Sequence, residues 1–228
     1  MKKISIIIPT YNEEETITEI VRRVTKQEEA GEVIIVDDGS TDKTWELLQQ
    51  IKSPKPEMKL IKHKINQGKG AAIRSGLKRV SLDYVLIQDA DLEYDPRNYP
   101  KLLKQASVKT VVYGSRLKTA NDYAYLTTLI GNVLVTFLCN LLFKTKLSDS
   151  YTGYKLIPFK IFKSLKLKSK GFEIEAEITG KLAKRKIPII EVPISYSPRK
   201  YKQGKKIKAR DALKGAITYI KIKLDKKG

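Results

Sequence analysis

Short apolar runs, rich in β-branched residues, alternate with segments of helical periodicity along the first half of the chain. The runs predict five buried strands, at residues 3–9, 33–36, 59–63, 84–87 and 109–113. Between the strands, apolar residues recur at helical spacing, as in the stretch from Ile17 to Val24 that follows three glutamates. Strands separated by helices predict right-handed crossovers. The pattern therefore predicts an α/β fold with one Rossmann-like, mostly parallel sheet flanked by helices.

The second half of the chain holds long amphipathic segments. The segment from Tyr123 to Phe143 is the most apolar, but threonines and asparagines interrupt it, and it falls short of the roughly 20 apolar residues that span a bilayer. We expect a helix that either packs on the sheet or rests in the membrane interface. Another helix is expected from Phe172, and residues 187–196 predict an edge strand because they contain two prolines. Residues 211–224 predict a final helix in which apolar residues stand beside lysines, a composition suited to membrane surfaces.

The net charge of +20 is concentrated in the second half of the chain. Residues 1–95 hold 15 Lys or Arg and 17 Asp or Glu, whereas residues 96–228 hold 30 and 8. A basic half attracts nucleic acid, an anionic membrane surface or phosphorylated lipid. A solvated tail or a thermophilic source explains part of the charge without any partner. Because no exposed aromatic platform is interleaved with the basic residues, we expect no nucleic-acid partner.

The rare residues restrict the chemistry and the compartment. The single cysteine, Cys139, excludes an internal disulfide, and we expect it to serve packing in a reducing compartment. The single histidine, His63, argues against a catalytic triad or a histidine metal site, and we expect it to be structural. The first apolar run is too short for a signal peptide because Pro9 and then acidic residues end it. These features favour a protein that is not exported.

A cluster of carboxylates follows the fourth predicted strand. Asp89 and Asp91 come directly after the apolar run from Tyr84 to Ile87, at the end of a strand where open α/β sheets bind ligands. Two carboxylates at such a place suit a divalent cation, Mg²⁺ or Mn²⁺, that also holds a diphosphate. A solvated turn would give the same pattern, since Asp-x-Asp is common in turns. Farther back in the chain, Gly68 and Gly70 are expected to let the backbone approach a ligand closely, although no Walker or dinucleotide fingerprint is present.

Seven motifs, taken together and in order, resemble glycosyltransferase family 2, specifically its dolichol-phosphate mannose synthase-like and polyprenyl-phosphate members. The resemblance covers residues 4 to about 210 and lies in Pro9–Glu13, Asp37–Thr44, Asn66–Gly70, Gln88–Asp91, Gly114–Arg116, Asp149–Lys155 and Glu191–Tyr196. It implies a GT-A fold, with a catalytic domain over residues 1–210. A nucleotide and metal half would end near residue 116, an acceptor half would follow, and residues 211–228 would form a basic amphipathic helix.

The resemblance also implies the reaction and the roles of individual residues. The reaction is an inverting, metal-dependent transfer of a hexose, mannose or glucose first, from a GDP- or UDP-sugar to dolichyl or polyprenyl phosphate. The donor pocket would comprise Pro9, Tyr11, Glu13, Val36, Asp38, Lys69, Gly70, Asp89 and Ala90. The metal would bind Asp89, Asp91 and Glu93, and the last stands where some relatives have glutamine. The acceptor phosphate would bind Arg116, Arg199, Lys205 and Lys206, and catalysis would depend on Asp89, Asp91 and Arg116.

The chemistry of a lipid phosphate agrees with this assignment. Such an acceptor is already anionic at neutral pH and needs no general base. Such an enzyme can rely on positioning of the two substrates, on a cation bound to the leaving diphosphate, and on arginines that hold the acceptor phosphate. If the acceptor were instead a glycan or a small molecule, Asp149 would be the first choice of base. Two competing hypotheses are a nucleic-acid-binding module and a structural protein that keeps the fold without activity, and the presence of both aspartates and Arg116 disfavours the second.

The expected location follows from the charge and from the family. Relatives in this group can carry carboxyl-terminal transmembrane helices, and this sequence shows none. We therefore expect a cytoplasmic protein bound peripherally to the cytoplasmic face of an anionic membrane. The helix around Leu129 to Leu142 and the basic carboxyl-terminal segment would hold it there.

Overall fold

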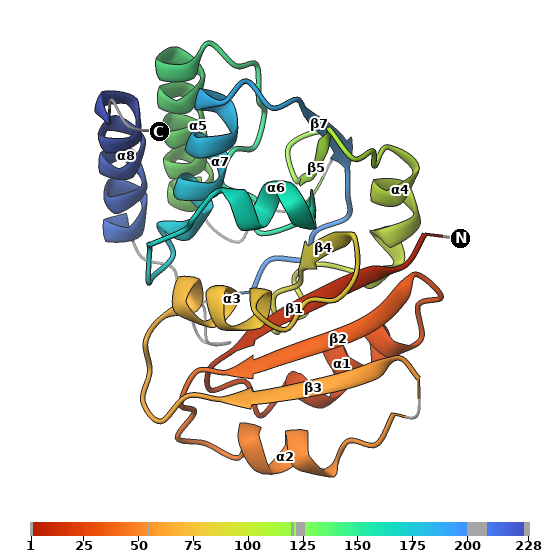
Figure 1. The fold of residues 1–228 in the computed structure, drawn as a ribbon. Helices are drawn as coiled ribbons and strands as arrows, with labels where there is room; N and C mark the ends of the chain where they lie inside the picture. The colour runs from red at the N-terminus through yellow and green to blue at the C-terminus, as the bar shows by residue number, and fades with distance from the viewer. Residues whose placement is uncertain (1, 54, 120, 122–125, 200–208, 226–228) are drawn as a thin grey trace.

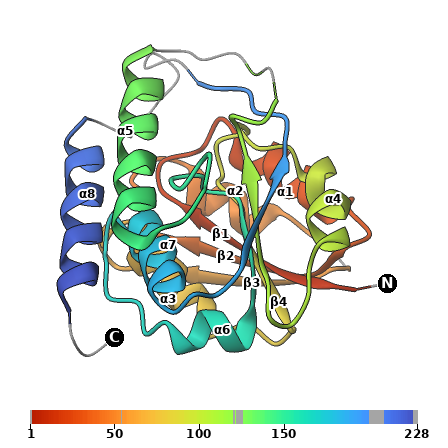
Figure 2. The same ribbon diagram turned by 90° about the horizontal axis from the view of Figure 1, so that it is seen from above.

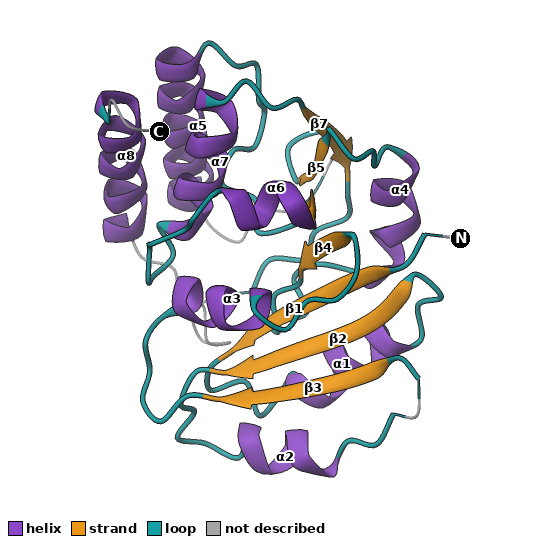
Figure 3. Ribbon diagram, viewed as in Figure 1, coloured by secondary structure: helices purple, strands orange, loops and turns teal. Residues whose placement is uncertain are grey.

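The computed structural model describes residues 2–53, 55–119, 121, 126–199 and 209–225. These residues build one seven-stranded sheet of order β3-β2-β1-β4-β6-β5-β7 (Figures 1 and 3). The strands are β1 Ile4–Thr10, β2 Ala30–Asp37, β3 Glu57–Lys62, β4 Tyr84–Ile87, β5 Val111–Ser115, β6 Lys155–Pro158 and β7 Ile189–Pro193. The helices are α1 Ile17–Thr25, α2 Thr44–Gln50, α3 Lys69–Leu77, α4 Tyr99–Lys104, α5 Leu126–Phe143, α6 Phe159–Ser164, α7 Ile174–Lys184 and α8 Ala209–Leu224, with a short 3₁₀ helix at Pro96–Asn98.

The sheet is mostly parallel, as the sequence predicts. β1 pairs in parallel with β2 and β4, β2 with β3, and β5 with β7. β6 is the exception, because it runs antiparallel to both of its neighbours, β4 and β5. The sequence pattern places Lys155 at the end of a loop and misses this strand, together with the short helices α4 and α6. The edge strand expected between residues 187 and 196 is confirmed as β7.

Both faces of the sheet are covered by helices, which explains why the strands read as continuous apolar runs. On one face, Ile4, Ile6 and Ile8 of β1 pack in a cluster with apolar residues of α1, α2 and α4. On the other face, Ile7 and Ile34 pack with residues of α3, α6 and α7. Successive β1 side chains thus enter opposite layers of the core. The rigid sheet fixes the ends of its parallel strands, where the functional side chains lie.

Helices α5 and α8 lie side by side at one end of the molecule and pack on α7 (Figures 1 and 2). Their inner sides meet in a small cluster that includes Val135, Cys139 and Tyr219, so the packing role expected for Cys139 is confirmed. Their outer sides carry an exposed apolar stripe, which we call the outer apolar face: Ile130, Val133, Leu134, Phe137 and Leu141 of α5 and Leu213, Ile217, Ile220 and Leu224 of α8. Of the segment expected to be helical, α5 therefore packs on the core with one side and exposes an apolar surface on the other. None of the helices within the described residues combines the length and apolar character that a membrane crossing requires.

Candidate functional site

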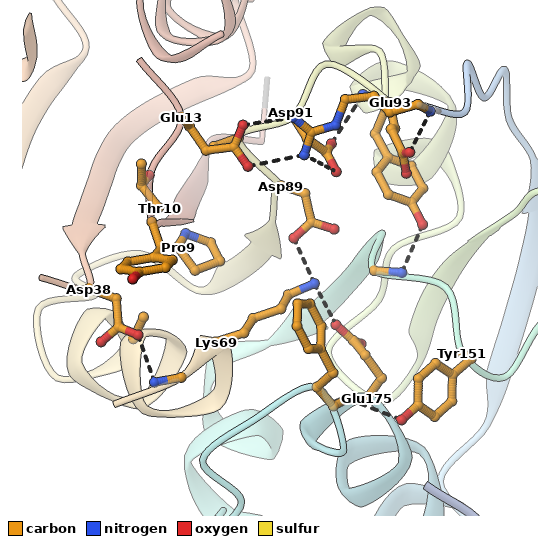
Figure 4. Close-up of a pocket in the computed structure, with 18 of the residues that line it drawn as sticks. Pro9, Thr10, Glu13, Asp38, Lys69, Asp89, Asp91, Glu93, Tyr151 and Glu175 are labelled. Atoms are coloured by element: carbon orange, nitrogen blue, oxygen red, sulfur yellow. Dashed lines mark hydrogen bonds and ion pairs between the residues drawn. The ribbon is translucent and has the colours of Figure 1, made fainter. Parts of the chain in front are cut away.

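A cavity of about 300 Å³ opens at the carboxyl ends of the parallel strands (Figure 4). β1 contributes Pro9 and Thr10, and the segment after β4 contributes Asp89 and Asp91. The opposite wall comes from the second half of the chain. Most of the predicted site residues line the cavity, namely Pro9, Tyr11, Glu13, Asp38, Lys69, Asp89, Ala90, Asp91, Glu93, Arg116 and Arg199.

Three predicted residues do not line this cavity. Val36 is fully buried in the core cluster that contains Ala72 and Ile73 of α3, so its side chain serves packing. Gly70 faces another loop of the protein, and Asp149 lies behind Arg116. The predicted acceptor residues Lys205 and Lys206 lie outside the described residues.

Asp38 fixes the loop that leads into α3. Its Oδ2 accepts a hydrogen bond of 2.6 Å from the backbone N–H of Gly68, and its Oδ1 accepts one of 3.0 Å from Gln67. His63 Nδ1 lies 2.6 Å from Asp38 Oδ1, and its Nε2 lies 2.9 Å from the hydroxyl of Ser75. The structural role expected for His63 is therefore confirmed, because the ring holds Asp38 in place. Asp38 in turn sets the backbone just before Lys69.

The two glycines of this loop lie in close contact with the backbone of another loop. A Cβ on Gly68, which has φ +96°, would lie 2.5 Å from the carbonyl oxygen of Lys170. A Cβ on Gly70 would lie 2.5 Å from the carbonyl oxygen of Ser169. The expectation of ligand approach is thus corrected for Gly70, because the loop before α7 fills the space that its missing side chain leaves, whereas Gly68 also lines the cavity. This contact brings the two halves of the chain together beside the cavity.

Lys69 joins the two walls of the cavity (Figure 4). Its Nζ lies 2.6 Å from Asp89 Oδ1 and 3.0 Å from Glu175 Oε1 of α7. Burial opposes a charge on this lysine, yet Asp89 and Glu175 raise its pKa above the ordinary value. The ammonium group is therefore charged throughout the neutral range. Glu175 also pairs with the buried Lys155 of β6, and although burial opposes it, the two lysines lower the pKa of Glu175.

Asp91 lies among other carboxylates. Burial, together with Glu93 and Asp89, raises the pKa of Asp91 to about 8. Arg199 offsets part of this crowding, since its Nη2 lies 3.5 Å from Asp91 Oδ2. The same guanidinium donates to both oxygens of Glu13, at 2.9 and 3.1 Å. Arg199, expected from the sequence to bind the acceptor phosphate, thus lies between Glu13 and Asp91, which are expected to bind the donor and the metal.

Glu93 holds the segment after β7 against the cavity. One of its oxygens accepts a hydrogen bond of 2.6 Å from the hydroxyl of Tyr196, and the other accepts one of 2.7 Å from the backbone N–H of Arg199. Both oxygens therefore bind protein donors. The arrangement gives Glu93 a defined task, placing Arg199, and the set of three metal ligands expected from the sequence is not assembled among the described residues.

Asp149 orients Arg116. Nε and Nη2 of Arg116 donate to the two oxygens of Asp149, each at 2.8 Å, and the backbone N–H of Arg116 adds a bond of 3.0 Å. Asn132 of α5 donates to the same carboxylate at 3.0 Å. Although the carboxylate is fully buried, Arg116 lowers the pKa of Asp149. Asp149 is thus an ionised partner of Arg116, which itself faces the cavity and lies over the ring of Tyr196 at 5.3 Å.

Comparison with known sequences identifies the family of this chain. A sequence model of the family described as "Glycosyl transferase family 2" matches residues 5–166, well over half of the chain. The chain belongs to glycosyl transferase family 2. The resemblance carried by the seven motifs is therefore confirmed at the level of the family.

Two curated relatives are similar over most of this family 2 chain. A dolichol-phosphate mannosyltransferase of Pyrococcus furiosus is 30% identical over 206 residues, which make up 86% of this chain and 57% of that relative. A UDP-N-acetylglucosamine–dolichyl-phosphate N-acetylglucosaminyltransferase of Methanococcus voltae is 29% identical over 225 residues, 90% of this chain and 89% of that relative. The chain thus spans little more than half the length of the first relative and nearly all of the second.

Solved structures agree on the fold of this family 2 chain. The glucosyl-3-phosphoglycerate synthase of Mycobacterium tuberculosis, solved with Mn²⁺, UDP and phosphoglyceric acid, superimposes with a TM-score of 0.74 at 18% identity. The match covers 98% of this chain and 79% of that chain. The α/β sandwich is therefore GT-A-like, as the motifs predict.

The carboxylate oxygens of the family 2 site fit a divalent cation that is held jointly with a diphosphate. No group of three or more His, Cys, Asp or Glu side chains is arranged to hold a metal ion within the described ranges. Asp89 and Asp91 offer carboxylate oxygens from one short segment, and the crowding of acids around Asp91 favours a cation there. Mg²⁺ in such sites takes one or two carboxylates and completes its shell with water and substrate phosphates. Asp89 and Asp91 would supply the protein share of that shell.

Sequence reasoning misses Glu175 as a site residue. The pattern of the segment Phe172–Glu177 indicates only the start of a helix, yet Glu175 lines the cavity and is only 3% exposed. A signal exists in hindsight, because Glu173, Glu175 and Glu177 alternate with apolar residues and cannot all face solvent on one side of a helix. Glu191 is likewise only part of a motif in the sequence, whereas in the structure it accepts the backbone N–H groups of Ser148 and Asp149.

Proposed function

We propose that the protein is an inverting glycosyltransferase that moves a hexose from a nucleoside diphosphate sugar to a polyprenyl phosphate such as dolichyl phosphate. The observation that supports this acceptor is the pair formed by Arg116 and Asp149. The carboxylate best placed to serve as a base in an acceptor loop is turned toward Arg116 and bound at both oxygens. An arginine oriented in this way at the cavity wall suits an anionic phosphate. The names of both curated relatives, which include dolichol phosphate or dolichyl phosphate, agree with this choice.

The reaction follows from the arrangement of charges. A phosphate oxygen of the lipid attacks the anomeric carbon of the donor sugar, and the bond from that carbon to the diphosphate breaks. Because the attacking oxygen is already anionic, no proton has to be removed. Arg116 holds the acceptor phosphate, and Asp89, Asp91 and Lys69 lie on the donor side. Mg²⁺ or Mn²⁺, when bound by the two aspartates, would supply positive charge to the leaving diphosphate.

The test of this function is a product assay. The protein is incubated with GDP-mannose, UDP-glucose and related nucleotide sugars, Mg²⁺ or Mn²⁺, and a short polyprenyl phosphate, and the lipid products are read by mass spectrometry. A sugar phospholipid from one donor supports the proposal, and our first candidates for the sugar are mannose and glucose. Donor hydrolysis without any lipid product would contradict the proposed acceptor and favour a glycan or small molecule.

The proposed acceptor is lipid-bound, so the enzyme has to meet a membrane surface. The outer apolar face supports such a contact, since Leu134 and Phe137 of α5 are 62% and 65% exposed. Lys214, Lys221 and Lys223 of α8 are exposed along the same helix pair. Apolar side chains flanked by lysines fit the interface of a bilayer that contains anionic lipid. The proposed location is therefore the cytoplasmic face of an anionic membrane, with the enzyme bound peripherally.

A double substitution on α5 tests the membrane contact. Leu134→Ser with Phe137→Ser is expected to lower binding to vesicles of anionic and neutral phospholipid about tenfold or more, because two apolar side chains no longer enter the interface. Binding is measured by vesicle flotation at low and at high salt. We expect high salt to weaken the vesicle binding of the wild-type protein as well. Val108→Ser is the matched control, since Val108 is 72% exposed but lies outside α5 and α8. Equal binding of the double variant and the control would contradict the proposed face.

A further inference from the structure

Four side chains of alternating charge run from the cavity into the interior, and Figure 4 shows the first three, Asp89, Lys69 and Glu175. Asp89 contacts Lys69 at 2.6 Å, and Lys69 contacts Glu175 at 3.0 Å. Glu175 in turn pairs with Lys155 of β6, which is fully buried. The chain of charges begins at the donor side of the cavity and ends within the sheet. It crosses from the first half of the protein to the second.

Stability alone gives no reason for this arrangement. Removing two charges from water is costly, and a buried ion pair can often be replaced by apolar residues of similar size without loss of stability. Lys155 is nevertheless well accommodated, because its ammonium also donates to the carbonyl of Thr152 and lies 4.9 Å from the centre of the Tyr113 ring. The inner pair is therefore firmly held. Glu175 has one oxygen on this fixed lysine, which leaves its other oxygen to direct Lys69.

The backbone of Lys69 is fixed independently of its side chain. Lys69 is the first residue of α3, and Asp38 binds the two N–H groups just before it. The backbone N–H of Ala71 donates to the carbonyl of Lys170 at 3.1 Å. The ammonium group, at the end of four methylenes, is then located by its two carboxylates. Without Glu175, we expect Lys69 to pair with Asp89 alone.

We propose that Glu175 is a positioning residue that holds the Lys69 ammonium at the cavity wall, where it binds the diphosphate of the donor. This inference rests on the proposed function for the class of donor. An ammonium group has three N–H donors. Within the described residues, Asp89 and Glu175 are the carboxylates within ion-pair distance of it. These two contacts leave at least one N–H of the ammonium to donate to a phosphate oxygen in the cavity that Lys69 lines.

Glu175→Gln tests the proposal, because the two hypotheses predict opposite changes in the affinity for a diphosphate. If Glu175 were only a negative charge near an anion, its removal would raise the affinity for a diphosphate. If Glu175 positions Lys69, the affinity falls, by about tenfold or more, because a charge-assisted hydrogen bond to the phosphate is lost. Binding of UDP and GDP, and of uridine and guanosine, is measured by titration calorimetry with a chelator present. The affinity for the nucleosides is expected to change less than twofold, because they carry no phosphate.

A double variant separates positioning from folding. Glu175→Gln alone leaves Lys155 buried without its carboxylate, whereas Lys155→Met with Glu175→Gln removes one charge of each sign. The double variant is expected to melt close to the wild type and still to lose diphosphate affinity. A double variant with wild-type diphosphate affinity would overturn the proposal, since Glu175 would then be needed only to neutralise Lys155.

A second buried pair supplies the matched control. Glu32 of β2 is 2% exposed and contacts Lys59 at 2.5 Å, toward the end of the sheet away from the cavity. Lys59→Met with Glu32→Gln is expected to keep the wild-type ratio of diphosphate to nucleoside affinity, and a loss equal to that of the Glu175 variants would overturn the proposal. The product assay is independent of this titration. If no sugar phospholipid forms but the Glu175 variants lose diphosphate affinity, the acceptor is wrong and the positioning role stands.

Discussion

Asp91→Asn is expected to lower the rate of sugar transfer about a thousandfold, because it removes a charged oxygen ligand from the cation that we propose stabilises the leaving diphosphate. Asp91 is half-buried beside Asp89 and Glu93, so a neutral amide there leaves the proposed cation with a weaker site. The measurement is the initial rate of sugar phospholipid formation at saturating donor and Mg²⁺. The control is Asp83→Asn, which changes an exposed aspartate just before β4, at the opposite end of the same strand.

A binding measurement accompanies this rate. In the wild-type protein, UDP or GDP with Mg²⁺ is expected to raise the melting temperature more than the same nucleotide with a chelator. Asp91→Asn is expected to lose this difference while melting no lower than the wild type without ligand, since the substitution relieves repulsion among carboxylates. A variant that transfers sugar within tenfold of the wild-type rate would show that Asp91 does not hold the metal.

Asp149→Asn is expected to lower kcat/KM for the lipid phosphate by about a hundredfold or more and to leave the donor affinity nearly unchanged. The reason is geometric, because the bidentate contact that orients Arg116 is lost, whereas the donor side of the cavity is not touched. The rate is measured as a function of acceptor concentration, and the measurement is repeated at several pH values from 5 to 9. The pH profile of the variant is expected to keep the wild-type shape. A wild-type profile that rises with pH, and a variant that has lost this rise, would indicate a general base and a hydroxyl acceptor.

The same substitution has a consequence for stability. Arg116 lowers the pKa of Asp149, so the ionised form stabilises the folded protein above the unfolded pKa of about 3.9. That contribution is lost as the pH falls through the lower pKa of the folded protein. Removing the carboxylate leaves the guanidinium of Arg116, which is 14% exposed, without its charged partner, and breaking such a pair costs about 3–5 kcal/mol when it is fully buried. Urea unfolding is therefore expected to show a large difference between wild type and Asp149→Asn at neutral pH and a smaller one near pH 3.

The sequence is most informative where residues act close to their own strand end. Asp89 and Asp91 follow an apolar run directly, and parallel strands bring their carboxyl ends to one edge of the sheet, so this wall of the cavity could be placed from local pattern alone. Glu13 and Asp38 are located by the same rule. The existence and direction of these strands depend on apolar periodicity, which the sequence states plainly.

The contacts that join the two halves of the chain are not recorded in any local pattern. Lys69 and Glu175 are more than a hundred residues apart in sequence, and their contact exists only because α7 packs on the same face of the sheet as α3. Gly70 illustrates a second limit, since a glycine that admits a ligand and one that admits a neighbouring loop have the same appearance in a sequence. β6 escapes prediction because it has only four residues and begins with a lysine, a residue that is rarely fully buried.

The position of β6 also restricts how this enzyme can be recombined with its relatives. β6 comes from the second half of the chain, yet it lies between β4 and β5 and pairs with both. A chimera joined after residue 116 would therefore carry a foreign strand into the centre of the sheet, where it must match the register of β4 on one side and β5 on the other. The two halves expected from the sequence therefore cannot be exchanged as separate modules. Acceptor preference in this architecture is more readily altered by replacing single loops than by exchanging half of the gene.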